Sequence, residues 1–147
     1  MSEPLDFVFW KSLCASVAFV LAVLNLLIML QLYGKIRLFS GAPQFLARWH
    51  RRQGDVILVL FVLIAYNCVT RGDVDPGSPR VLAHAVLGSL TLAVIALKFV
   101  TVNWIPRLMN HIAVIGAALF VATTGTVVTS ALWYFVTWIR EGARPVY

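Results

Sequence analysis

Long uncharged stretches separated by short polar segments dominate the pattern along this chain. Residues 12–34 form 23 uncharged positions between two lysines, enough for one membrane span of about 20 residues. Trp10 and Tyr33 flank this stretch, where interfacial aromatic residues are expected. Residues 108–139 form 32 uncharged positions, more than a span needs, so we expect this last helix to tilt or protrude.

The two middle spans have to be located from their polar boundaries. Residues 56–70 give only 15 uncharged positions, too few to cross a hydrocarbon core of roughly 30 Å at about 1.5 Å per residue. The second helix must therefore begin before Asp55, which carries His50 to the membrane boundary. Ser78 and Pro79 suit the start of a third helix, which ends near Trp104 after the snorkelling Lys98, and Pro106 opens the fourth.

These boundaries predict an all-α fold, an integral membrane four-helix up-down bundle. We expect residues 1–147 to form a single domain with spans at about 9–33, 47–70, 80–103 and 107–138. Composition agrees, since 61% of the residues are hydrophobic and only 12% are charged.

Charge distribution predicts the orientation of the bundle. The chain has 12 lysines and arginines against 6 acidic residues, and the excess lies between the apolar stretches, where it indicates contact with membrane lipid and not with nucleic acid. The positive-inside rule then puts the first and third loops in the cytoplasm and both termini outside, and we expect a bacterial inner membrane. The basic residues that decide this are Lys35, Arg37, Arg48, Arg51, Arg52 and Arg107.

A histidine at the inner end of the second helix and another at the inner end of the fourth suggest a cofactor site. The second and fourth helices of an up-down bundle run parallel and face each other across the core, so His50 and His111 could ligate one metal at the same depth. A b-type haem suits two axial imidazoles, and Gly54, four residues after His50, leaves room on the same helix face. Cations for the haem propionates would come from Arg48, Arg51, Arg52 and Arg107.

Other interpretations of the histidines stay open. His50 and His111 would also be comfortable as interfacial residues beside lipid phosphates, and the haem interpretation depends on their pairing. His84 has no histidine partner in the outer half of the bundle. It is therefore a core histidine, a ligand of an exogenous group, part of a metal site with Cys14 and Cys68, or one half of a second haem site.

Short motifs in all four spans carry a family resemblance. They are Leu24-Asn25, Trp49-His50-Arg51-Arg52, the segment Ala-His-Ala-Val-Leu-Gly at 83–88, and Asn110-His111. The pattern resembles the four-helix core of the ascorbate-dependent transmembrane cytochrome b and ferric-chelate reductase superfamily, and related small bacterial four-helix proteins. Members usually hold two haems with four histidines and pass electrons across the membrane. The resemblance implies that His50 and His111 form the inner pair and that His84 is an outer position without its partner.

Three functions remain as hypotheses at this point. The first is a b-type haem-binding subunit that transfers electrons to or from a redox protein, a larger membrane redox complex or a quinone, with one haem and a second at His84 as an open alternative. The second is a non-catalytic scaffold or assembly subunit of a respiratory or photosynthetic complex. The third is a metal or haem delivery factor using His84, Cys68 and Cys14. No nucleophile with a nearby base and no phosphate-binding loop is recognisable, so we expect no self-contained catalytic site.

Overall fold

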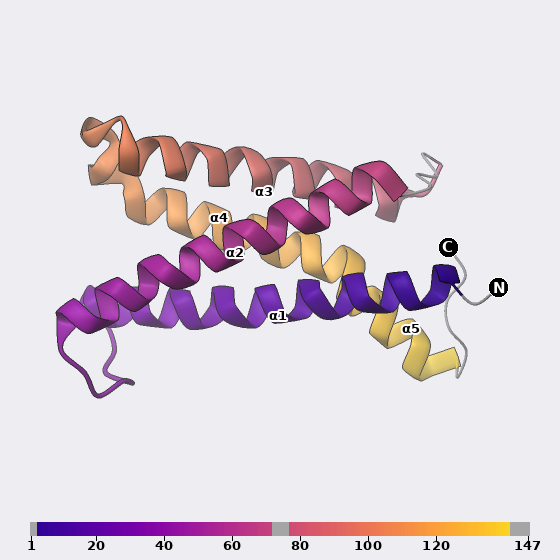
Figure 1. Cartoon of the computed structure of the whole chain (residues 1–147), viewed down its shortest axis with the longest axis horizontal. Helices are drawn as coiled ribbons and strands as arrows, with labels where there is room; N and C mark the ends of the chain where they lie inside the picture. Colours follow the sequence, from indigo (N-terminus) through magenta and orange to yellow (C-terminus); the bar gives the residue numbers. More distant parts are fainter. Residues whose placement is uncertain (1–2, 72–76, 142–147) are drawn as a thin grey trace.

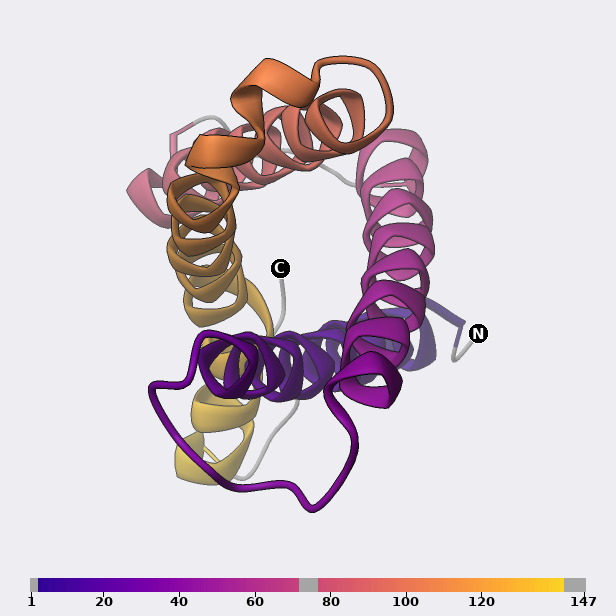
Figure 2. The same ribbon diagram turned by 90° about the vertical axis from the view of Figure 1, so that its left-hand side faces the viewer.

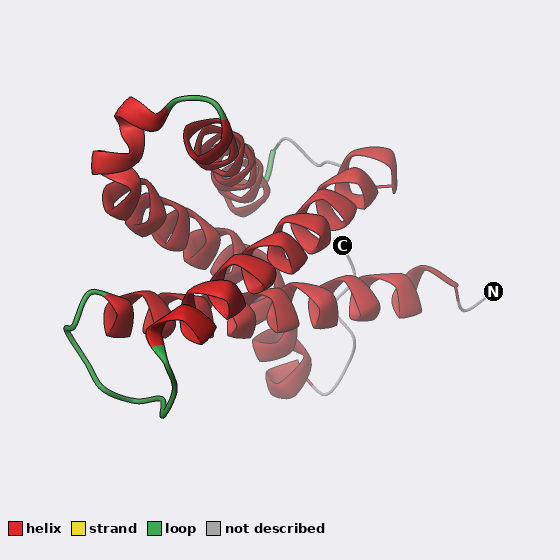
Figure 3. Ribbon diagram, turned by 60° about the vertical axis from the view of Figure 1, so that its left-hand side comes forward, coloured by secondary structure: helices red, strands yellow, loops and turns green. Residues whose placement is uncertain are grey.

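The described part of the chain consists of helices joined by short loops and turns. The structure is a computed structural model and describes residues 3–71 and 77–141, in which no strand occurs (Figure 3). Its first three helices are α1 (Glu3–Leu32), α2 (Pro43–Arg71) and α3 (Pro79–Asn103). The last part consists of a 3-10 helix η1 (Pro106–His111), α4 (Ile112–Val127), a π-helix η2 (Val128–Leu132) and α5 (Trp133–Glu141). The predicted all-α class is confirmed.

Four helical stretches are long and apolar enough to cross a membrane. They are Phe9–Leu32, Pro43–Thr70, Pro79–Asn103 and Pro106–Arg140. Successive stretches run in opposite directions (Figure 1), and a view along the bundle shows α1, α2, α3 and α4 as the four sides of a ring (Figure 2). The predicted up-down membrane bundle is confirmed, and α2 lies diagonally opposite α4.

The two ends of the bundle differ in what they carry. One end holds the loop 33–42 and the segment 104–111, and we call it the basic end because of its lysines and arginines (Figure 1). The opposite end, where α1 begins and α5 ends, is called the terminal end. Loop 33–42 is fastened by the Gln31 side chain, whose Oε1 accepts hydrogen bonds from Leu38 N at 2.9 Å and Phe39 N at 2.7 Å.

Packing divides the bundle into two tight pairs. Helix α1 packs along α2, and α3 packs along α4, whereas α2 and α3 touch over far fewer residues. One apolar cluster joins three of the helices through Ala18, Ile57, Phe61 and Ile95. A second links α1 to the last stretch through Ala15, Val127 and Ala131, whose small side chains allow close approach of the helices.

The helix starts and the last span differ from the sequence prediction. Helix α2 begins at Pro43, four residues before the predicted start at 47. Proline is favourable at the first helical position, because its missing N–H has no helical partner there and its ring meets no preceding turn. The last stretch is not one regular helix from 107 to 138. It starts with 3-10 geometry at Pro106 and contains the π-segment η2 at Val128–Leu132.

Two side chains of α3 compensate for the π-segment. A change from i−4 to i−5 pairing leaves carbonyl groups near the junction without their usual helical donors. Arg80 Nη1 donates to the Thr129 carbonyl at 3.0 Å, and the guanidinium lies 5.7 Å from the ring centroid of Trp133. His84 Nδ1 donates to the Thr126 carbonyl at 3.2 Å. Arg80 and His84 are one helical turn apart, and together they fasten α3 to α4; we call this pair the α3 clasp.

Gly125 of α4 offers a test of the close α3–α4 packing. A Cβ atom at Gly125 would come 2.9 Å from Leu87 Cδ1 and 3.4 Å from Leu87 Cδ2, whereas one at Gly116 of the same helix would meet nothing within 4 Å. We expect Gly125→Ala to lower the stability of the purified protein by about 1–3 kcal/mol because Leu87 must move, and Gly116→Ala to leave it unchanged or raise it slightly. Thermal unfolding in detergent measures both. Equal stability of the two variants would contradict the close contact.

Candidate functional site

His50 lies on the face of α2 that points into the bundle. On this face Leu46, Gln53, Ile57 and Phe61 are buried, and His50 itself is half-buried. Its Nδ1 atom is inaccessible and has no hydrogen-bond partner among the described residues. A buried imidazole nitrogen without a partner is costly, and such a group in a native protein commonly marks a bound water, ion or ligand.

Three further buried polar atoms near the basic end have no partner. They are Asn25 Oδ1 on α1, Gln53 Oε1 on α2 and Thr101 Oγ1 on α3, and their side chains are at least nine-tenths buried. Each unpaired polar group costs about 1–3 kcal/mol when water cannot reach it. No other buried side-chain nitrogen or oxygen within the described ranges lacks a partner. All the unpaired groups therefore belong to one half of the bundle.

Two residues of other helices interact with His50. The backbone of Asn25 on α1 acts on the ring without coming within hydrogen-bond distance of Nδ1, and the charge of Lys98 on α3 acts on it as well. A Cβ atom at Gly54 would lie 4.0 Å from Asn25 Nδ2, so the amide of Asn25 sits beside the glycine. Gln53 and Thr101 lie one turn beyond His50 and Lys98 on their own helices. We call Asn25, His50, Gln53, Lys98 and Thr101 the polar cluster.

Lys98 gives the polar cluster a positive charge. Its side chain is half-buried, and no acidic side chain in the described part of the chain forms an ion pair with it. A lysine inside a membrane span is expensive unless it reaches the interface or meets a negative or polar group. The cluster thus combines a cation and an imidazole, which suit a negatively charged or accepting group of a ligand, with unpaired amide oxygens, which suit a hydrogen-bond donor.

His111 occupies the same end of the bundle but a different environment. It is the last residue of η1, directly before α4, and its side chain is exposed. Arg107, also on η1, is exposed as well. His50 and His111 thus lie on diagonally opposite sides of the ring at the basic end, the first half-buried and the second exposed, and their joint ligation of one haem stays a prediction.

The arginines near His50 do not share its helix face. Arg48 and Arg52 are each two positions from His50, and residues at that spacing point to opposite sides of a helix. Both are exposed, as is Arg51, whereas Gly54 lies one turn from His50 on the inward side. Of the residues predicted to surround a haem on α2, the structure brings Gly54 close to His50 and turns Arg48 and Arg52 away.

His84 is part of the α3 clasp. Because a carbonyl oxygen can only accept, its hydrogen bond to Thr126 puts the ring proton on Nδ1 and leaves a lone pair on Nε2. The positive charges of Lys11 and Arg80 act on this ring. Across residues 3–71 and 77–141 no three His, Cys, Asp or Glu side chains are grouped to hold a metal, so His84 is not brought together with both Cys14 and Cys68. The hydrogen bond between α3 and α4 is the role that the structure gives His84.

Sequence reasoning did not assign a site role to most of the polar cluster. In the sequence, Asn25 stands out only as part of a short motif and Lys98 as a snorkelling residue, while Gln53 and Thr101 have no predicted role. A signal was available, because Asn25 lies seven residues before the end of α1 and His50 seven residues after the start of α2. Equal distance from the same membrane surface places both at one depth.

One protein family matches the part of the chain that contains the spans and the polar groups described above. A family model described as a family of unknown function (DUF6529) matches residues 5–140. The chain belongs to this family. The matched range includes all four spans, the polar cluster and the α3 clasp. No curated protein and no solved structure matches the chain in such comparisons.

Two threonines of α3 test whether the polar cluster contains a buried group without a hydrogen bond when no ligand is bound. Thr101 and Thr91 are both fully buried, but Thr101 Oγ1 has no partner, whereas Thr91 Oγ1 donates to Leu87 O at 2.8 Å and lies 3.2 Å from Thr126 Oγ1. We expect Thr101→Val to be neutral or stabilising, and Thr91→Val to destabilise by about 0.5–2 kcal/mol. Thermal unfolding of ligand-free protein measures both. A larger loss for Thr101→Val would show that its hydroxyl is paired.

Proposed function

We propose that the chain is a b-type haem-binding membrane subunit that passes electrons to or from a partner redox protein or a quinone. One observation carries the proposal: His50 faces the bundle interior with a buried, unpartnered ring nitrogen, in the same half of the bundle as three other unpaired polar groups. Intramembrane ionisable residues are rarely retained without a function. Such a subunit needs no catalytic residues of its own, and it would act within a larger complex.

The residues around His50 are suitable for holding a haem. His50 would supply a ring nitrogen to the haem iron, and Gly54 keeps the same side of α2 free of a side chain, where a Cβ would be in van der Waals contact with Asn25 Nδ2 at 4.0 Å. Lys98 would balance the charge of a propionate, and Asn25 would hydrogen-bond to a propionate or to the His50 ring. His111, on the diagonally opposite stretch, would be the second histidine that holds the haem. A bound haem supplies a one-electron redox couple.

The basic end supports an orientation in the membrane. Lys35, Arg37 and Arg107 are exposed there together with the arginines of α2. By the positive-inside rule, the basic end and the proposed haem site face the cytoplasm, and both termini face outward. We infer that the membrane is a bacterial inner membrane, where a cytoplasmic redox protein or a membrane quinone would reach His50.

A reduced-minus-oxidised spectrum of the full chain, purified from haem-supplied cells, tests the proposal. We expect an alpha band from about one haem per chain, which His50→Gln abolishes because the inward ligand is lost. His111→Gln should convert a six-coordinate spectrum to a five-coordinate one. His84→Gln is the control, since it removes a histidine from the same bundle without touching the polar cluster.

The same spectra define the results that would contradict the proposal. A colourless wild-type protein, or unchanged haem content in His50→Gln, would mean that His50 holds no haem. Loss of haem in His84→Gln but not in His50→Gln would move the site to the terminal end.

A second function is favoured by one feature of the packing. Helices α2 and α3 touch over few residues, so the bundle is least closed along this side, where a helix of another subunit could pack. This supports a non-catalytic scaffold or assembly subunit of a respiratory or photosynthetic complex. Such a protein would purify without a haem spectrum but together with its partner subunits, and the same purification separates the two functions.

A further inference from the structure

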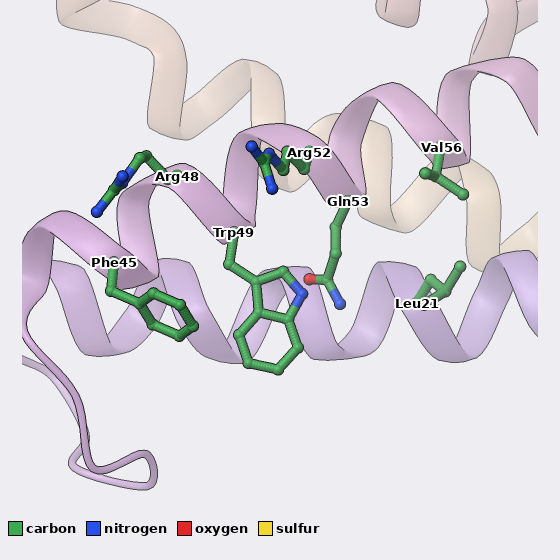
Figure 4. Close-up of a pocket in the computed structure, with 7 residues that line it drawn as sticks. All are labelled: Leu21, Phe45, Arg48, Trp49, Arg52, Gln53 and Val56. Carbon is green, nitrogen blue, oxygen red and sulfur yellow. The ribbon is translucent and has the colours of Figure 1, made fainter.

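An open groove runs along the outer side of the α1–α2 pair. It has a volume of about 740 Å³ and is lined by Leu21 of α1 and by six residues of α2. These six are Phe45, Arg48, Trp49, Arg52, Gln53 and Val56. Figure 4 shows Phe45, Trp49 and Gln53 reaching from α2 toward α1, with the two arginines along the same stretch of α2. Its volume falls within the range of about 300–1,000 Å³ typical of small-molecule sites.

Charge and apolar surface are separated along this groove. Arg48 and Arg52 lie one helical turn apart near the basic end, and neither forms an ion pair within the described residues. Leu21 lies near the middle of the Phe9–Leu32 span, so the other end of the groove reaches the hydrocarbon core. The groove therefore leads from two free cations near the interface to an apolar surface deep in the membrane.

Aromatic side chains stand at the junction between these two parts. The rings of Phe45 and Trp49 pack edge to face with centroids 5.9 Å apart, and both side chains remain exposed. Aromatic residues favour the glycerol and headgroup level of a bilayer. Gln53 is buried at the base of the groove, and its Oε1 has no partner. The groove thus offers cations, an interfacial aromatic pair and an unpaired acceptor in sequence.

We propose that this groove is a specific binding site for one anionic phospholipid. The phosphate accepts hydrogen bonds from Arg48 and Arg52, whose planar guanidinium groups bind phosphate well. One acyl chain lies along Val56 and Leu21, and the glycerol region packs on Phe45 and Trp49. The two arginines lie on the side of α2 away from His50, and the groove shares only Gln53 with the polar cluster, so the phosphate contacts do not depend on the proposed haem.

Charge complementarity favours a phospholipid over a quinone in this groove. A quinone headgroup is neutral and would leave both arginine charges unbalanced in a partly apolar groove, whereas one phosphate compensates them. The arginines are one turn apart on α2, a spacing at which two side chains can reach one small ligand. An amphiphile with a negative headgroup matches both the charge and the depth.

Native mass spectrometry of the full chain tests the site. The protein is released from detergent containing phosphatidylglycerol or phosphatidylcholine with identical acyl chains, and retained lipid is titrated. We expect one phosphatidylglycerol to be retained with roughly tenfold or greater preference, and Arg48→Gln with Arg52→Gln to remove that preference. Lys35→Gln with Arg37→Gln is the matched control, because it removes two exposed charges from the same end outside the groove and should leave retention unchanged.

A variant that keeps the charges tests the apolar part. Val56→Trp fills the groove at a half-exposed position and should reduce retention of phosphatidylglycerol although both arginines remain. An equal loss of phosphatidylglycerol preference in the arginine double variant and in the Lys35/Arg37 control would mean that general surface charge retains the lipid, and it would overturn the proposal. Equal retention of both lipids, or stoichiometric retention of a quinone from the host membrane in place of phospholipid, would overturn it as well.

Discussion

Pairing of polar groups inside the membrane is the constraint on which this structure depends. Lipid offers no hydrogen bonds, so a polar atom within a span must find its partner in the protein or in a ligand. In the half of the bundle near the terminal end this is achieved. The α3 clasp supplies donors to carbonyls at the π-segment, and Thr91 meets Thr126 across the same interface. These contacts make α3 and α4 a tightly joined pair.

The half near the basic end does not satisfy the same constraint. His50 and Thr101 are the counterparts of His84 and Thr91 in residue type, yet their polar atoms have no partner. The difference is not one of composition, because both halves contain histidine, threonine and a cation. It lies in which helices surround these residues, since α2 and α3 barely touch and cannot complete each other's hydrogen bonds. A ligand between them would do so.

Helix α2 serves two environments at once. Its segment 48–55 contains a histidine and several charges, and the helical period distributes them over opposite faces. His50 and Gly54 turn toward the bundle, whereas Arg48 and Arg52 border a groove open to lipid. A single charged segment at the start of a span can therefore place a histidine toward the bundle interior and two arginines toward its surface, with Gln53 lying between the two groups.

The sequence by itself determined the class, the number of spans and their alternating direction, because run length and charge position are local properties of the chain. The ends of the membrane-crossing stretches lie within a few residues of the predicted ones, although the helix geometry changes inside the last span. Tertiary structure alone decided which face of each helix points inward, since lipid is as apolar as the core and leaves little hydrophobic asymmetry to detect. It also decided that Asn25 and Lys98 approach His50 and that His84 donates a hydrogen bond to Thr126, next to the π-segment. Hydrogen-bond pairing depends on the rotation and contact of separate helices, and no stretch of sequence contains that information.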